Sequence, residues 1–369
     1  MIRPRRPGIG LLSIMLLWCV GAASVRAAES SEAILSANLR EHAGLSLVWE
    51  STLPVKKGER LNVMELHGNR LYVRSSRNYV WSLDRANGDV VFSRSVARPG
   101  IPVVGWQVYG NRIVSVVGGQ LVELDTDTGI EQRVSDLELS IVGAPVRNEL
   151  FFYVSAGDRR LHVLRAKDMV QMFEVSARNE SLITSVLGDD EMAVFGTNEG
   201  NLIAIMADAP RKLWQFDAAG PITGSVVRDG RSFYFASKDT NVYRVDTQGT
   251  PLASLAWKFQ TEAVLDRGPR LTRDVVYQYA LGRGLTAIDK ATGQPLWYLR
   301  QGLDLLAEVA GKAYVITTRK TLAVMDNATG KRLYRVNIAG VVNHVANSMD
   351  SQIYIADENG RLACLRPGQ

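Results

Sequence analysis

The chain has few of the residues that build disulfides or metal sites: two cysteines and four histidines among 369 residues. Only Cys364 remains if Cys19 leaves with an export signal, so the mature chain cannot form an internal disulfide and must be stabilised by packing. The histidines lie far apart without ligand-like spacing, and we expect no metal site. They are His42, His67, His162 and His344.

Two further absences narrow the class of protein. Past residue 45 the chain has no sustained helical periodicity. It also has no run of Lys and Arg with interleaved aromatic residues, which argues against a nucleic-acid groove. The formal net charge of +5 includes four arginines before residue 28, so the chain without them is close to neutral.

The first 28 residues are typical of an export signal. Arg3, Arg5 and Arg6 precede a short apolar stretch at 11–20, and small residues around Ala27 suit cleavage. The stretch is too short for a stable membrane anchor, so we predict cleavage and release into the periplasm. The alternative is lipidation of Cys19, but Trp18 stands where that motif requires a small residue. We expect residues 29–44 to form a short leader and residues 45–369 a single domain.

One pattern returns eight times between residues 80 and 366, at intervals of about 40 residues. Each copy has an aliphatic residue, a second hydrophobic residue three positions on, and then a marker that is Asp in five copies. The markers are Asp84, Asp125, Arg165, Met206, Asp246, Asp289, Asp326 and Arg366. Three turn signals per copy cut it into four strand-length pieces, which is the make-up of one propeller blade.

The markers also begin turns. Glycine follows four positions later in Asp84–Gly88, Asp125–Gly129, Asp289–Gly293 and Asp326–Gly330, where Asp caps backbone N–H groups and Gly allows a left-handed conformation. A bulky residue lies eight positions after most markers, and we expect it to cover the neighbouring blade. These residues are Phe92, Phe173, Trp214, Trp297 and Tyr334; Arg133 departs from the rule, and Trp257 arrives three residues late.

The eighth copy ends too early to supply its own outer strand. Residues 46–52 have the right composition for it and carry Trp49. We therefore predict an all-β, eight-bladed β-propeller closed by pairing of an N-terminal strand with the C-terminal strand, which would remove exposed sheet edges. We also expect a monomer.

Residues 285–297, LTAIDKATGQPLW, resemble the tryptophan-docking repeat of the quinoprotein (PQQ-like) β-propeller superfamily. Residues 80–92 and 322–334 are weaker versions, and the resemblance covers residues 45–369. It implies eight blades. Quinoprotein dehydrogenases of this superfamily carry a vicinal cysteine pair and large insertions, which this chain lacks. We therefore expect neither a cofactor nor catalysis, although a dehydrogenase or a small-molecule binder that uses the central channel remains the alternative.

A second branch of the superfamily, the outer-membrane β-barrel assembly lipoproteins, has a similar size, the same blade count and no catalytic site. Residues 194–206 look like the corresponding blade of that branch. This resemblance implies a protein partner in the cell envelope. By position, the loop that includes Leu182 and Ile183 would contact it, whereas the branch's own Leu-Ser-Leu-Arg stretch is not present at 180–185.

Overall fold

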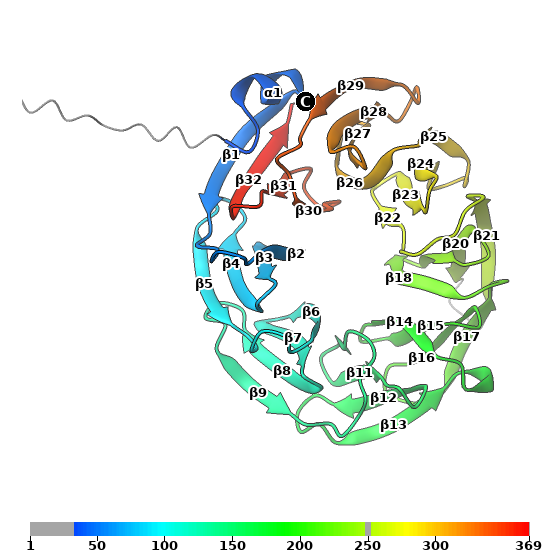
Figure 1. The fold of residues 1–369 in the computed structure, drawn as a ribbon. Helices are drawn as coiled ribbons and strands as arrows, with labels where there is room; N and C mark the ends of the chain where they lie inside the picture. The colour runs from blue at the N-terminus through cyan, green and yellow to red at the C-terminus, as the bar shows by residue number, and fades with distance from the viewer. Residues whose placement is uncertain (1–32, 248–251, 369) are drawn as a thin grey trace, which may run out of the picture. The chain divides into compact units, whose positions relative to one another are not determined.

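A computed structural model describes residues 33–247 and 252–368. The predicted export signal, including Cys19, lies outside these residues. The chain divides into two units, Met1–Ala33 and Ile34–Gln369, and the fold described below is that of the second. It contains eight four-stranded antiparallel sheets, which confirms the predicted eight-bladed β-propeller. Figure 1 shows the sheets following one another around a central opening.

The first four blades follow the chain order. Blade 1 consists of β2 (Leu61–His67), β3 (Arg70–Ser75), β4 (Tyr79–Asp84) and β5 (Val90–Ser95). Blade 2 consists of β6 (Val103–Tyr109), β7 (Arg112–Val117), β8 (Gln120–Asp125) and β9 (Glu131–Ser135). Blade 3 consists of β10 (Val146–Arg147), β11 (Phe151–Ser155), β12 (Arg160–Arg165) and β13 (Gln171–Ser176). Blade 4 consists of β14 (Ile183–Gly188), β15 (Met192–Thr197), β16 (Asn201–Met206) and β17 (Lys212–Asp217).

The last four blades complete the ring, and the eighth takes one strand from the N-terminal side. Blade 5 consists of β18 (Ile222–Asp229), β19 (Ser232–Ser237), β20 (Asn241–Thr247) and β21 (Ala253–Gln260). Blade 6 consists of β22 (Arg270–Leu271), β23 (Val275–Ala280), β24 (Gly284–Asp289) and β25 (Pro295–Leu299). Blade 7 consists of β26 (Gly302–Val309), β27 (Lys312–Thr317), β28 (Thr321–Asp326) and β29 (Arg332–Asn337). Blade 8 consists of β30 (Asn343–Val345), β31 (Ile353–Ala356), β32 (Arg361–Pro367) and β1 (Leu45–Thr52).

The third strand of each blade is largely buried on both faces, as its position between two neighbouring blades requires, and most of its buried side chains are apolar. In β8, β16 and β28 four consecutive residues are buried. These strands end at the sequence markers, so the hydrophobic pair before each marker belongs to the core. The core itself is divided into clusters that bridge adjacent blades, such as the cluster that joins Trp214 of blade 4 to Phe233 of blade 5.

A β-bulge recurs where the third and fourth strands pair, and it sets the direction of the outer side chains. In blades 4 and 6 the shift follows Ala204 and Ala287, which pair with Trp214 and Trp297. In blade 5 Arg244 pairs with Trp257, so the late tryptophan occupies the same register as the others. The longer turn before Trp257 therefore leaves the position of this tryptophan in the blade unchanged.

The closing strand repeats this register. β1 pairs with β32, and Trp49 lies opposite Cys364, two residues before the marker Arg366. Before β1, the helix α1 (Ala37–His42) occupies part of the predicted leader. Leu35 and Ala43, on either side of α1, are buried in a cluster with side chains of blades 7 and 8. Residues 34–44 are therefore packed on the propeller.

Candidate functional site

The Asp markers cap turns in four blades. The carboxylate of Asp289 accepts hydrogen bonds from the backbone N–H and the hydroxyl of Thr292, both at 2.7 Å. Asp125 and Asp326 make equivalent contacts with Thr128 and Thr329. These donors hold the pKa of each of these three carboxyl groups below its usual range. Asp84 accepts from the N–H of Ala86. A carboxylate that is held ionised in this way suits a turn cap better than a catalytic base.

Asp246 differs from the other predicted turn residues. Its two carboxylate oxygens accept hydrogen bonds from Nε and an Nη of Arg244, at 2.9 and 3.0 Å. The strand β20 continues past it to Thr247. The guanidinium of Arg244 also donates to the carbonyl of Lys290 in blade 6. Asp246 therefore orients an arginine that links two blades.

The predicted docking residues join each blade to the next. The indole Nε1 of Trp49 donates to the carbonyl of Arg85 at 2.8 Å, and that of Trp257 donates to Lys290 at 3.1 Å. Their rings cover Gly88 and Gly293, where a Cβ atom would lie 2.5–2.6 Å from ring carbons. Trp297 donates to Asn327 and lies beside Gly330, Phe92 covers Gly129, and the ring of Trp214 contacts that of Phe233. The tryptophan ring can lie this close only because glycine has no Cβ atom.

Arg133 also joins its blade to the next, through a guanidinium group in place of an aromatic ring. The sequence did not suggest this role. Arg133 pairs with Glu123 in the register that Trp297 shares with Ala287. Its Nη1 donates to the carbonyl of Ala166 at 2.6 Å in blade 3. The carboxylate of Glu123, only 3% exposed, also accepts from Arg147 at 2.8 Å. An Arg–Glu–Arg group with a buried carboxylate and two half-buried guanidinium groups thus joins blades 2 and 3.

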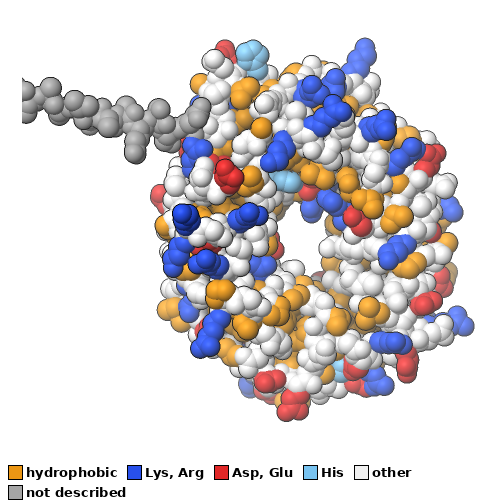
Figure 2. All heavy atoms as spheres, in the orientation of Figure 1, with side chains coloured by type: hydrophobic (Ala, Val, Ile, Leu, Met, Phe, Trp, Pro, Cys, Tyr) orange, Lys and Arg blue, Asp and Glu red, His pale blue; other side chains and the backbone are white. Residues whose placement is uncertain are grey.

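The central channel contains a cavity of about 600 Å³. Figure 2 shows the opening between the blades. Bulges in the inner strands, at Val104–Gln107 in β6, Thr223–Val227 in β18 and Gly302–Asp304 in β26, supply several of its lining residues.

The most buried charge in this cavity is the carboxylate of Asp304. It contacts Arg270 at 3.4 Å and His344 at 3.5 Å, and it accepts from the N–H of Leu305. Burial alone would raise the pKa of Asp304, but hydrogen bonds and charges from His344 and Arg270 outweigh it and lower that pKa.

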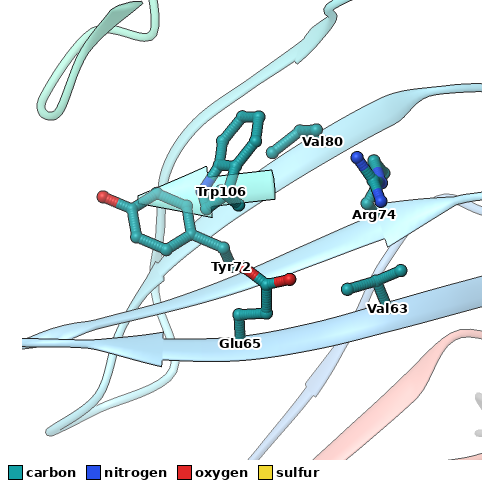
Figure 3. Close-up of a pocket in the computed structure, with 6 residues that line it drawn as sticks. All are labelled: Val63, Glu65, Tyr72, Arg74, Val80 and Trp106. Atoms are coloured by element: carbon teal, nitrogen blue, oxygen red, sulfur yellow. The ribbon is translucent and has the colours of Figure 1, made fainter. Parts of the chain in front are cut away.

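A much smaller cavity, of about 10 Å³, lies between blades 1 and 2. Figure 3 shows Tyr72, Trp106, Glu65 and Arg74 around it, with Val63 and Val80. This volume suits one water molecule and no larger ligand. Among the residues that the structure describes, no group of three or more His, Cys, Asp or Glu side chains could hold a metal ion, and no helix is long and apolar enough to cross a membrane.

One end of the ring carries the loops between blades and the turns between the second and third strands of each blade; we call it the loop face. The two kinds of segment are hydrogen-bonded, as Ser76 N to Arg60 O and Leu281 N to Val264 O illustrate. In five interblade loops an apolar residue shortly before the next blade is 38–48% exposed. These residues are Ile101, Val142, Leu182, Val264 and Val342.

The structure separates the two residues that the sequence suggested for partner binding. Leu182 is 38% exposed on the loop face, whereas Ile183 is 4% exposed and packs with Ala177 and Phe195. Just before them, Asn179 and Glu180 both have positive φ, 57° and 48°. Such strain in a residue other than Gly is often found at functional loops. Of the pair, only Leu182 has its side chain exposed.

Comparison with known proteins agrees with this architecture. The family model described as outer membrane protein assembly factor BamB matches residues 43–249, 198–333 and 238–369. The crystal structure of BamB from Moraxella catarrhalis superposes with a TM-score of 0.65 at 15% identity, covering 87% of this chain and 97% of that one. The computationally designed Ika8 protein gives 0.64 at 14% identity, covering 86% and 98%. No curated protein matches the chain. Because the family model spans nearly all of the propeller, the chain belongs to the family of the outer membrane protein assembly factor BamB.

Proposed function

We propose that the protein is a non-catalytic propeller of the cell envelope that binds a protein partner through its loop face, in the assembly of outer-membrane proteins. The observation that carries this proposal is the placement of an exposed apolar residue on five of the interblade loops. Apolar groups held on a rigid scaffold and surrounded by polar residues are typical of interaction surfaces. Membership of the BamB family supports outer-membrane protein assembly as the process in which the protein acts.

The proposal includes export. Residues 1–28 would direct the chain to the periplasm and be removed, and the propeller would act there as a monomer. If cleavage occurs as proposed, the mature protein begins near Ala28 and appears in the soluble periplasmic fraction when the membranes are washed at high ionic strength. Incorporation of radiolabelled palmitate would instead demonstrate lipidation of Cys19 and attachment to a membrane.

Leu182 provides a test of partner binding. We expect Leu182→Asp to weaken recovery of envelope proteins cross-linked to the purified propeller, because a carboxylate in a buried apolar contact is strongly unfavourable. Met172→Asp is the matched control, since Met172 is 45% exposed on the outer strand β13 and lies away from the loop face. Equal recovery with both variants, or no specific partner with the unchanged chain, would contradict the proposal.

The channel cavity favours a second candidate function, the binding of a small molecule with or without dehydrogenase activity. Its volume suits such a ligand, and Arg270, Asp304 and His344 supply polar groups. Adding PQQ with Ca²⁺ tests the quinoprotein form of this idea, because a ligand at about 100 times its dissociation constant stabilises a protein by about 2.7 kcal/mol. An unchanged thermal midpoint would remove it.

A further inference from the structure

Charge is unevenly distributed on the loop face. Around blades 7, 8 and 1 the loops and turns carry exposed Lys and Arg residues, which we call the basic arc. Its members are Arg300, Arg319, Lys320, Lys56, Lys57, Arg60, Arg77 and Arg98. Figure 2 shows Lys and Arg side chains gathered over the regions of β1–β5 and β26–β29.

Little negative charge opposes the basic arc. Glu59 is buried, where it accepts hydrogen bonds from Ser75 and from the N–H of Lys56, and Asp357 is held by Arg361. Glu358 is the exposed carboxylate in the same turns. Within residues 33–247 and 252–368, no member of the basic arc forms an ion pair. Around blades 2–4, in contrast, the loop face carries more acidic side chains: Asp136, Glu138, Asp158, Glu180 and Glu199.

Apolar side chains are interleaved with the basic arc. Val342, in the loop between blades 7 and 8, is 47% exposed, and Ile101, three residues after Arg98, is 40% exposed. The carbonyl groups of Arg98 and Ile101 both accept hydrogen bonds from the side chain of Asn78, which fixes this loop against blade 1. The basic and apolar groups are thus presented together on one end of a rigid sheet structure.

We propose that the basic arc binds the surface of an anionic lipid bilayer directly. Long basic side chains at the tips of separate turns, without acidic partners or a pocket, suit a diffuse layer of negative headgroups. Val342 and Ile101, in the loops after blades 7 and 1, would enter the interfacial region, which leaves Val142, Leu182 and Val264 for the protein partner. An acidic protein is the less favoured partner, because protein recognition relies on concentrated, desolvated contacts. This inference rests on the proposed location in the envelope but not on the identity of the protein partner.

Sedimentation with lipid vesicles tests the proposal, using the processed protein purified from the periplasm. We expect binding to vesicles that contain phosphatidylglycerol, little binding to pure phosphatidylcholine, and release at high ionic strength. Neutralising Lys56, Lys57, Arg77 and Arg98 to Gln should lower partitioning by more than about tenfold, because each basic residue near an anionic surface contributes to binding.

A matched control removes the same charge from the other end of the ring. Lys167, Arg211, Arg273 and Lys331 are exposed in turns opposite the loop face, and their replacement by Gln should change partitioning by less than about twofold. Equal losses in both variants, or no preference for anionic vesicles, would overturn the proposal. The proposal would also be overturned if the basic-arc variant kept its vesicle affinity but lost an acidic protein from envelope pulldowns. Retained sensitivity of partner recovery to Leu182→Asp would show that the proposed function stands even if lipid binding fails.

Discussion

At the docking positions a glycine leaves the space that an aromatic ring fills. Gly293 has φ of +75°, and a Cβ there would lie 2.6 Å from Cγ of Trp257. Gly311 has φ of +74° but no atom within 4 Å of the equivalent point. Gly311→Ala therefore introduces backbone strain alone, at about 1–2 kcal/mol. We expect Gly293→Ala to cost a further 1–3 kcal/mol or so through displacement of the ring.

Urea denaturation of both variants measures the difference between these free energies of unfolding. Equal losses would mean that the tryptophan ring shifts without cost and that the glycine serves only the turn. The comparison isolates docking because the two backbone conformations are nearly the same.

Glu123 is a residue whose importance appears only in three dimensions. It is buried between Arg133 and Arg147, and removing its charge leaves two guanidinium groups without their partner. We expect Glu123→Gln to lower the free energy of unfolding by about 3–5 kcal/mol, the usual effect of breaking a buried ionic group. Glu262→Gln, in an exposed pair with Arg283, should cost less than about 1 kcal/mol. Similar losses from both would contradict the assigned role.

Among the elements, the inner strand β26 places Asp304 between blades 6 and 8. The pKa of Asp304 is lowered in the folded protein. Its ionised carboxylate therefore stabilises the fold fully above the unfolded-state pKa of about 3.9, and this stabilisation is lost as pH falls through the folded-state pKa. Asp304→Asn should therefore destabilise the protein at pH 7, and the difference from the unchanged protein should shrink as pH falls below about 3.9. Chemical denaturation at a series of pH values measures this, with Asp266→Asn, in an exposed pair with Arg267, as the control. A difference that is independent of pH would contradict ionisation of Asp304 as the cause.

The regular elements were predictable because turn residues and strand periodicity are local. The Asp and Gly of residues 289–293 and 326–330 formed the expected turns, and Trp257 reached its register despite its longer connection. The irregular inner strands were not predictable. The bulge at Gly105 depends on close approach to Ala144 of the next blade, and the bulge at Gly224 depends on close approach to Gly268. Such contacts leave no periodic signal in the sequence.

For the whole molecule, the number of blades followed from the repeat, but the candidate sites did not. Leu182 and Ile183 are adjacent in sequence, and only the start of β14 decides that one is exposed and the other buried. The apolar residues of the loop face are separated by about 40 residues or more, so their shared location follows from ring closure. Likewise, Arg133 takes the place of a docking aromatic residue because Glu123 lies opposite it in the adjacent strand.

Ring closure gives the last prediction. The ring of Trp49 lies 6.0 Å from that of Tyr354 in its own blade and covers Gly88 of blade 1, so one side chain connects the two ends of the propeller. Trp49→Ala should lower the free energy of unfolding by about 3–5 kcal/mol, as for other buried aromatic residues. Leu47→Ala, in the same strand but 40% exposed, should cost less than about 0.5 kcal/mol. Deletion of residues 29–53 should expose the edge of β32 and cause aggregation, because an unpaired edge strand can pair with another molecule. If guanidinium denaturation gives Trp49→Ala the stability of Leu47→Ala, and the deleted protein remains monomeric in light scattering, the N-terminal strand does not hold the ring closed.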